Sequence, residues 1–171
     1  MQSLDEIQFG GRNEVFKPGD DGFYGGRPVR WFKDRPELLE RIVAFALERG
    51  WSDLILYGEA CGSGIQKGVR YVEGDEVVFR AFDVCVGDNF VTYDLFVELC
   101  EAVELPRVCE VWRGEPSLAA FDPLLERPSL EAQRNGVRDI RGVAEGVSSS
   151  GPTRFCGTKW DAALRGGLAE R

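Results

Sequence analysis

The residue whose type and position most suggest chemistry is a glutamate that follows an apolar run. Glu59 comes after the apolar segment 54–57 and before a loop with three glycines between residues 62 and 68. Because glycine permits positive φ and a close approach of the backbone to a ligand, a carboxylate at this strand end suits a sugar hydroxyl or a metal ion. The alternative is an ordinary surface loop over 58–68 with Glu59 as a solvated residue.

A second carboxylate lies inside an apolar segment much further along the chain. Glu145 falls in the run 142–147, where glycine, valine and alanine surround it. Placing an ionised glutamate inside a strand costs several kcal/mol unless it meets a cation or a hydrogen-bond donor. Glu145 is therefore a candidate site residue.

Two phenylalanines occupy an alternating segment near the glycine loop. Residues 77–84 alternate so that Val78, Arg80, Phe82 and Val84 share one face, and Phe79 lies on the other. One of the two rings must then face away from the main core. Such a ring could stack on a nucleobase, or it could simply pack within the sheet.

The elements that would position these residues are short strands and amphipathic helices. Asp34 and Glu37 form a capping-box pattern around Pro36, which suits a first helical turn. A helix should follow and end at Gly50. Its apolar face would carry Leu38, Ile42, Phe45 and Ala46.

Further strands and helices follow the glycine loop. The segments 69–72 and 77–84 flank the turn 73–75 and predict an antiparallel hairpin. Downstream we expect a helix over 93–103, a strand over 108–112 and one or two short helices within 117–141.

Composition and charge limit the classes of function. The chain has 171 residues, is 43% apolar and can bury one sizeable core. Its net charge of −8 argues against a protein whose whole surface binds nucleic acid. A local basic cluster remains, and it could face phosphates or be a solvated face; it comprises Arg12, Lys17, Arg27, Arg30 and Lys33.

The absence of histidine excludes several reaction types. Ser/His/Asp and Cys/His nucleophile chemistry and histidine-rich metal cages need a residue that the sequence lacks. The five cysteines have no CxxC spacing and read as reduced core residues of a cytoplasmic protein. No segment is long and apolar enough to predict a membrane span, so we expect no membrane partner.

Several short segments together resemble the ATP-dependent RNA ligase family, the branch of covalent nucleotidyltransferases that includes phage RNA ligase 2 and the RNA-editing ligases. Residues 57–71 resemble motif III, residues 79–84 resemble motif IIIa and residues 144–147 resemble motif IV. Residues 11–15 with 20–24 resemble the segment around motif Ia. These segments stand in the family's order, which makes the resemblance more specific than any one motif.

The resemblance implies an α+β fold of the nucleotidyltransferase, or adenylation-domain, type, with mainly antiparallel sheets and outer helices. ATP (as AMP during transfer) and Mg²⁺ would be the cofactors, RNA ends the substrate and RNA repair the setting; a protein partner is unknown. By this resemblance Glu59 would accept a hydrogen bond from the ribose 2′-hydroxyl, and Phe82 would stack on adenine. Arg12 would contact the sugar or phosphate, Glu145 would help to hold the metal, and Lys159 would reach the α-phosphate as a motif V lysine.

The sequence also departs from the family pattern. Motif I supplies the lysine nucleophile ahead of motif Ia, but no lysine precedes Arg12, so we expect no lysyl-AMP on this chain. Residues 148–152 should break the motif IV strand, and Asp161 stands where motif V usually has a second lysine.

These departures lead to a hypothesis about the organisation of the chain. Residues 1–147 would form a partial ligase-like domain that lacks its N-terminal part, and residues 148–171 an atypical tail. The alternatives are a degenerate nucleotide-binding module without ligase chemistry, and an α+β interaction protein whose glycine loop resembles the motif by chance.

Overall fold

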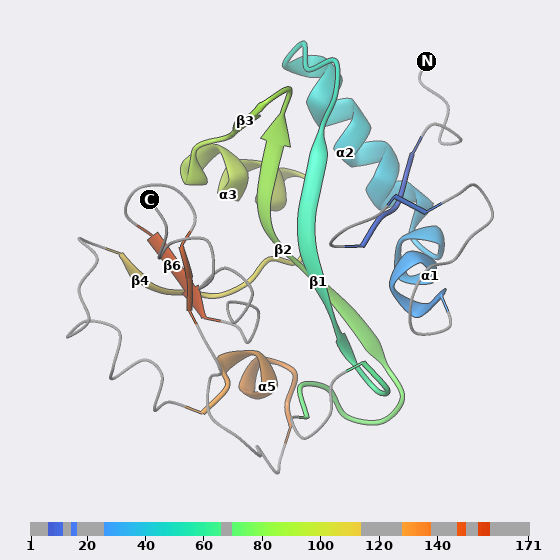
Figure 1. The fold of residues 1–171 in the computed structure, drawn as a ribbon, viewed down its shortest axis with the longest axis vertical. Coiled ribbons are helices and arrows are strands. Elements are labelled where there is room, and N and C mark those ends of the chain that lie inside the picture. Colours follow the sequence, from blue (N-terminus) through green and yellow to red (C-terminus); the bar gives the residue numbers. More distant parts are fainter. Residues whose placement is uncertain are drawn as a thin grey trace. The chain divides into compact units, whose positions relative to one another are not determined.

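The computed structural model describes residues 7–11, 15–16, 26–65, 70–113, 128–137, 147–149 and 154–157 (Figure 1). The fold is α+β, as predicted, with a small antiparallel sheet of three strands and a few helices. The chain divides into two compact units. The first unit comprises residues 1–60 and 77–106, and the second comprises residues 61–76 and 107–171.

Helices and strands alternate irregularly along the chain. The helices are α1 (Arg27–Lys33), α2 (Pro36–Glu48), α3 (Tyr93–Ala102) and α5 (Leu130–Arg134). The strands are β1 (Ile55–Gly62), β2 (Val77–Val86), β3 (Asn89–Phe90), β4 (Glu110–Arg113), β5 (Val147–Ser149) and β6 (Arg154–Gly157).

Helix α2 confirms the predicted apolar face but not the predicted N-cap. Its buried residues are Leu38, Ile42, Phe45 and Ala46. The capping box is wrong, because Asp34 ends α1, where its N–H donates to the carbonyl of Arg30. The N-cap of α2 is Arg35, which makes no side-chain cap. Only Asp34 and Arg35 separate α1 from α2, so Asp34 ends the first helix and does not serve as the N-cap of the second.

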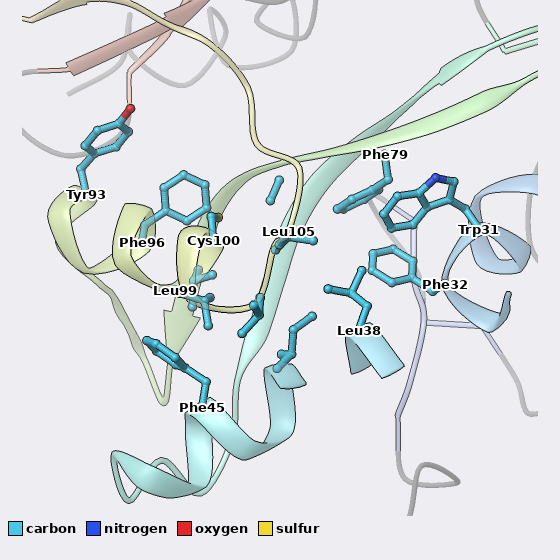
Figure 2. Packing of buried hydrophobic residues seen from close by; sticks show 14 residues of the cluster. Trp31, Phe32, Leu38, Phe45, Phe79, Tyr93, Phe96, Leu99, Cys100 and Leu105 are labelled. Carbon is cyan, nitrogen blue, oxygen red and sulfur yellow. The ribbon is translucent and has the colours of Figure 1, made fainter. Parts of the chain in front are cut away.

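Helix α1, which the sequence pattern did not predict, supplies two large aromatic residues to the core of the first unit. Trp31 and Phe32 are buried, and their rings meet edge-on with centroids 5.0 Å apart. The ring of Phe79 lies 4.6 Å from that of Phe32. Figure 2 shows these rings together with the apolar side chains of α2 and α3. Burial of these side chains against one face of β2 gives the unit its core.

The three-stranded sheet has the order β1-β2-β3. The predicted hairpin is wrong in one strand: β2 forms, but its partner is β1 and residues 70–72 are not a strand. Within the second unit, Asn135 donates from Nδ2 to the carbonyl of Tyr71 at 2.8 Å. That side-chain bond occupies a carbonyl that a strand ladder would use. The predicted turn remains, with Gly74 at φ 64°.

Strand β2 departs from simple alternation. Phe79, Ala81 and Val84 all belong to the core cluster. The prediction that Val84 shares a face with Phe82 is therefore wrong, and the alternation shifts by one residue between Ala81 and Val84. At the shifted position the carboxylate of Asp83 accepts a hydrogen bond from the N–H of Val84 at 2.9 Å.

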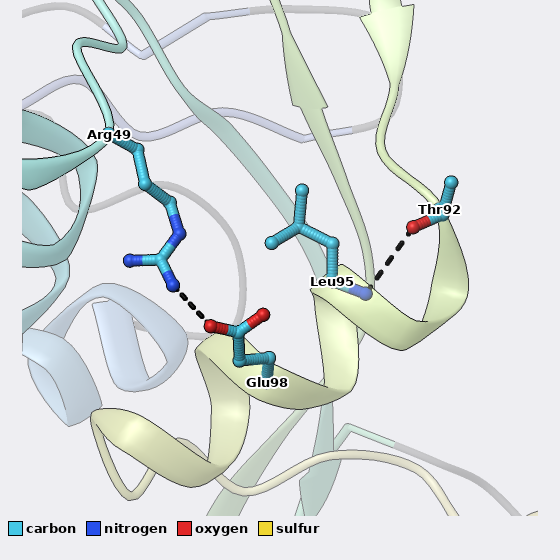
Figure 3. Close-up of polar contacts among 4 residues, drawn as sticks. All are labelled: Arg49, Thr92, Leu95 and Glu98. Carbon is cyan, nitrogen blue, oxygen red and sulfur yellow. Dashed lines mark hydrogen bonds and ion pairs between the residues drawn. The ribbon is translucent and has the colours of Figure 1, made fainter.

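Helix α3 occupies the predicted position and is capped at its N-terminus. Thr92 accepts a hydrogen bond from the N–H of Leu95 at 3.4 Å (Figure 3). Glu98 of α3 pairs with Arg49, the residue that follows α2. The guanidinium of Arg49 also lies 3.5 Å from the ring centroid of Phe45. These contacts join α3 to the end of α2.

The second unit contains a small antiparallel sheet in the order β4-β6-β5. Ser148 and Ser149 belong to β5, so the strand does not end at Val147 as predicted. In the same unit Ser129 caps α5 by accepting a hydrogen bond from the N–H of Ala132 at 3.2 Å. The proposed division into 1–147 and 148–171 stays a prediction.

The cysteine prediction agrees with the described part of the chain. Cys61, Cys85 and Cys100 are buried thiols, and Cys109 is a half-buried thiol. They act as small apolar side chains.

Candidate functional site

Glu59 lies within strand β1 and not at its end. The predicted strand 54–57 was too short, because β1 continues to Gly62. Leu56 packs against the core cluster. A Cβ atom at Gly58 would lie 2.0 Å from Cζ of Phe79, so Gly58 also faces the core. Since side chains alternate along a strand, Tyr57 and Glu59 project from the opposite side of the sheet.

The glycine at position 58 is explained by this packing. The ring of Phe79 and the carbonyl oxygen of Arg80 occupy the space where a side chain would go, the latter at 2.7 Å. The glycine therefore allows β1 to approach a large core ring closely. Because β1 continues through Gly58, the pleat of the strand sets the side of the sheet from which the Glu59 side chain projects.

Phe82 projects from the same side as Tyr57. The two rings stack with centroids 6.4 Å apart and an angle of 29° between their planes. Phe90 of β3 also reaches Tyr57, with ring centroids 5.6 Å apart. The prediction that either Phe79 or Phe82 leaves the core is confirmed: Phe79 is buried in the core cluster and Phe82 is not part of it.

We call this side of the sheet the outer face. It is the side opposite the core cluster, and it carries Tyr57, Glu59, Arg80, Phe82 and Phe90. Arg80 belongs to it because both of its neighbours in β2, Phe79 and Ala81, point into the core. All five residues belong to the first unit.

The outer face has an aromatic end, which is exposed at Phe90, and a polar end that is less exposed to solvent. Phe90 is 63% exposed, whereas Arg80 is 8% exposed and Glu59 is half-buried. In β1, Glu59 follows Tyr57 by two residues, and in the antiparallel β2, Arg80 precedes Phe82 by two residues. The polar pair therefore lies about 7 Å along the sheet from the aromatic pair. An elongated ligand could therefore meet rings at one end and hydrogen-bonding groups at the other.

Burial sets the protonation of the acidic groups near this face. Removal from water raises the pKa of Glu59 from 4.5 to about 9. Glu59 is thus a neutral carboxylic acid at pH 7, with one O–H donor and a carbonyl acceptor. Burial also raises the pKa of Asp83, against the opposing effect of the hydrogen bond from the N–H of Val84.

Two of the five predicted site residues, Glu59 and Phe82, lie on the same side of neighbouring strands. Arg12, Glu145 and Lys159 lie outside the described residues. In the described ranges, no three or more histidine, cysteine, aspartate or glutamate side chains gather in a way that could hold a metal ion. The Mg²⁺ assignment to Glu145 therefore stays a prediction.

Sequence reasoning missed two aromatic residues of the outer face. Tyr57 stands two residues before Glu59, and that spacing already places both on one side of a strand. Phe90 gave no such signal, because β3 has only two residues and its contact with Tyr57 depends on how the chain turns after β2.

Comparison of the chain with protein-family models, with curated protein sequences and with solved structures finds no match. Among the helices that the structure describes, none combines the length and the apolar character needed to cross a membrane.

Proposed function

We propose that the outer face binds the adenosine part of a nucleotide, and that the chain is a protein of the ATP-dependent RNA ligase type. The observation that carries this proposal is the placement of Glu59 and Phe82 on one side of two neighbouring strands. The ring contact between Tyr57 and Phe82, at 6.4 Å, and the inward direction of Gly58 support that placement.

The chemistry of these side chains suits a nucleoside. The half-buried ring of Phe82 offers a flat apolar surface on which adenine can stack, and such stacking contributes about 1–3 kcal/mol per base. The carboxyl of Glu59 lies about 7 Å further along the sheet, where a ribose hydroxyl would follow the base. Rings and carboxyl together thus match the order of groups in adenosine.

The protonation of Glu59 favours a sugar over a metal ion as its partner. A carboxylic acid that is neutral at pH 7 has no charge to attract Mg²⁺, but it can exchange hydrogen bonds with a hydroxyl. In our proposal Mg²⁺ is held by Glu145 and by the phosphates of ATP, and Arg12 and Lys159 contact the phosphates. The sheet of the first unit would then be part of a nucleotidyltransferase fold.

The reaction class that accompanies this proposal is the ATP-dependent joining of RNA ends through transfer of AMP. Such transfer needs a nucleophile, and no lysine of this chain precedes Arg12. We therefore propose that the polypeptide of residues 1–171 binds the nucleotide but does not adenylate itself.

Calorimetric titration with AMP tests the binding proposal. Wild-type protein should bind AMP, and Phe82→Ala should weaken binding about 10-fold or more. Glu59→Ala should weaken it by a similar or smaller factor, because one hydrogen bond is lost. Leu47→Ala and Glu40→Ala, which change exposed residues of α2, are the controls. Equal affinities for all variants would refute the proposal.

Incubation with ATP labelled at the α-phosphate and with Mg²⁺ tests the chemistry separately. The expected result is noncovalent binding without label on the polypeptide. Covalent label on this chain would contradict the statement that the nucleophile is absent, and would place the chain among self-adenylating ligases.

A further inference from the structure

A chemically labile asparagine lies at the end of α5. Of the three asparagines in the sequence, Asn135 is the one that a glycine follows. Gly136 has φ 71°, a left-handed conformation that suits the residue after a helix and favours glycine. Because glycine has no Cβ, its backbone nitrogen can approach the preceding side chain with little hindrance. Asparagine is also a thermolabile residue, so we expect the amide of Asn135 to hydrolyse more readily than that of any other asparagine in the chain.

The amide of Asn135 joins two segments of the second unit. Its Nδ2 donates to the carbonyl of Tyr71 at 2.8 Å and to Oε1 of Glu131 at 3.0 Å. Tyr71 and Glu131 are both buried. Since an amide NH2 group has two N–H donors, each contact takes one of them. The side chain of Asn135 thereby ties residues 70–72 to the C-terminal end of α5.

We propose that Asn135 is a modification site, at which water hydrolyses the side-chain amide to a carboxylate and so releases residues 70–72 from α5. The substrate is the protein itself, and the co-reactant is water. The proposal does not depend on nucleotide binding, because its residues belong to the second unit and the outer face belongs to the first.

The reaction has two steps, and neither changes the oxidation state of any atom. First, the backbone nitrogen of Gly136 attacks Cγ of Asn135 and forms the N–Cγ bond of a cyclic imide. The Cγ–Nδ2 bond breaks, and ammonia leaves with the proton that the Gly136 nitrogen gives up. Water then adds to one carbonyl of the imide and breaks the bond from that carbon to the nitrogen, which regains a proton. The product is aspartate, or isoaspartate where the main chain runs through Cγ.

The folded state opposes this reaction, and the product weakens the fold. The N–H of Gly136 donates to the carbonyl of Gln133 at 3.0 Å. Ring closure must break this bond and the two bonds of Nδ2, so it proceeds from a locally opened form. A carboxylate at position 135 offers no donor to the carbonyl of Tyr71, and its negative charge lies next to the carboxyl group of Glu131. Loss of a hydrogen bond to a buried carbonyl destabilises the closed form, so the segment opens more often after hydrolysis.

Peptide mapping of the full-length chain by mass spectrometry tests the reactivity. The protein is kept in mildly alkaline buffer, either folded or in guanidinium chloride, and conversion is followed at Asn135 and at Asn89, which precedes Phe90. In denaturant Asn135 should convert faster than Asn89. In the folded protein Asn135 should convert at least about 10-fold more slowly than in denaturant. Equal rates at the two asparagines in denaturant, or equal rates at Asn135 in both states, would overturn the proposal.

Hydrogen exchange of the Asn135→Asp variant tests the release. Amides of residues 70–73 and 132–137 should exchange at least about 10-fold faster than in the wild type. Gln133→Glu makes the same change from amide to carboxylate on an exposed side chain of α5, and it should exchange like the wild type. Unchanged exchange in Asn135→Asp, or equal acceleration in Gln133→Glu, would show that the Asn135 amide does not hold the segment. Should Asn135→Asp not fold, aged wild-type protein is measured instead, since mass resolves its asparagine and aspartate forms, and the same criteria decide.

Discussion

Replacement of Glu59 by glutamine should make the protein more stable in alkaline solution. Burial raises the pKa of Glu59 from 4.5 to about 9. Between these two pH values the folded protein keeps a proton that the unfolded chain has lost. The stability of the wild type must therefore fall as pH rises through this window. Glutamine cannot ionise, so Glu59→Gln should not show this fall.

The size of the effect follows from the pKa change. A change of one in pKa is equivalent to about 1.4 kcal/mol. Because Glu59 ionises in the unfolded chain while it stays protonated in the folded protein, the free energy of unfolding should fall by about 3 kcal/mol between pH 4.5 and 7, and by about 6 kcal/mol by pH 9. These values are upper limits, since part of the side chain contacts water.

Urea unfolding at pH 5, 7 and 9, monitored by tryptophan fluorescence, measures the effect. Trp31 lies in the core of the first unit and reports on that unit. Glu59→Gln and wild type should be similar at pH 5, and the variant should be more stable by several kcal/mol at pH 9. Glu40→Gln, an exposed control in α2, should follow the wild type at each pH. A difference between Glu59→Gln and wild type that does not change with pH would refute the reasoning.

Two further predictions concern the elements that position the outer face. Gly58→Ala should destabilise the protein by about 1–3 kcal/mol in urea unfolding, because the new methyl group meets the ring of Phe79. The cost should be smaller in a Phe79→Leu background, and an equal cost in both would contradict a clash with that ring. Thr92→Ala should cost about 1 kcal/mol through loss of the α3 cap, whereas Thr92→Ser should keep the cap. Equal unfolding midpoints for Thr92→Ala and wild type would show that the cap adds no stability.

Local patterns predicted those elements whose signal is periodic. The face of α2 follows from apolar residues at helical spacing, and the structure buries the same four residues that the pattern selects. In the first part of β2, before the alternation shifts between Ala81 and Val84, alternation likewise separates Phe79 from Phe82. In both cases burial on one side of a regular element decides the outcome.

Features that depend on distant contacts were not predictable in this way. Residues 70–72 have a strand-like composition, but the Tyr71 carbonyl binds Asn135, which is far away in the sequence. The length of β1 depends on its pairing with β2, so Glu59 was expected at a strand end and lies inside the strand. Helix α1 is short, and its aromatic residues are ordered by the core that they help to form.

The most direct test of the central claim is the contact between adenine and the outer face in solution. Nuclear Overhauser effects between AMP and protein with labelled aromatic rings can identify the ring that lies against the base. We predict nuclear Overhauser effects from the adenine protons to the rings of Phe82 and Tyr57. The effect to the ring at position 82 should disappear in the Phe82→Leu variant. Bound AMP whose adenine contacts neither ring, or a complete absence of binding, would contradict the account.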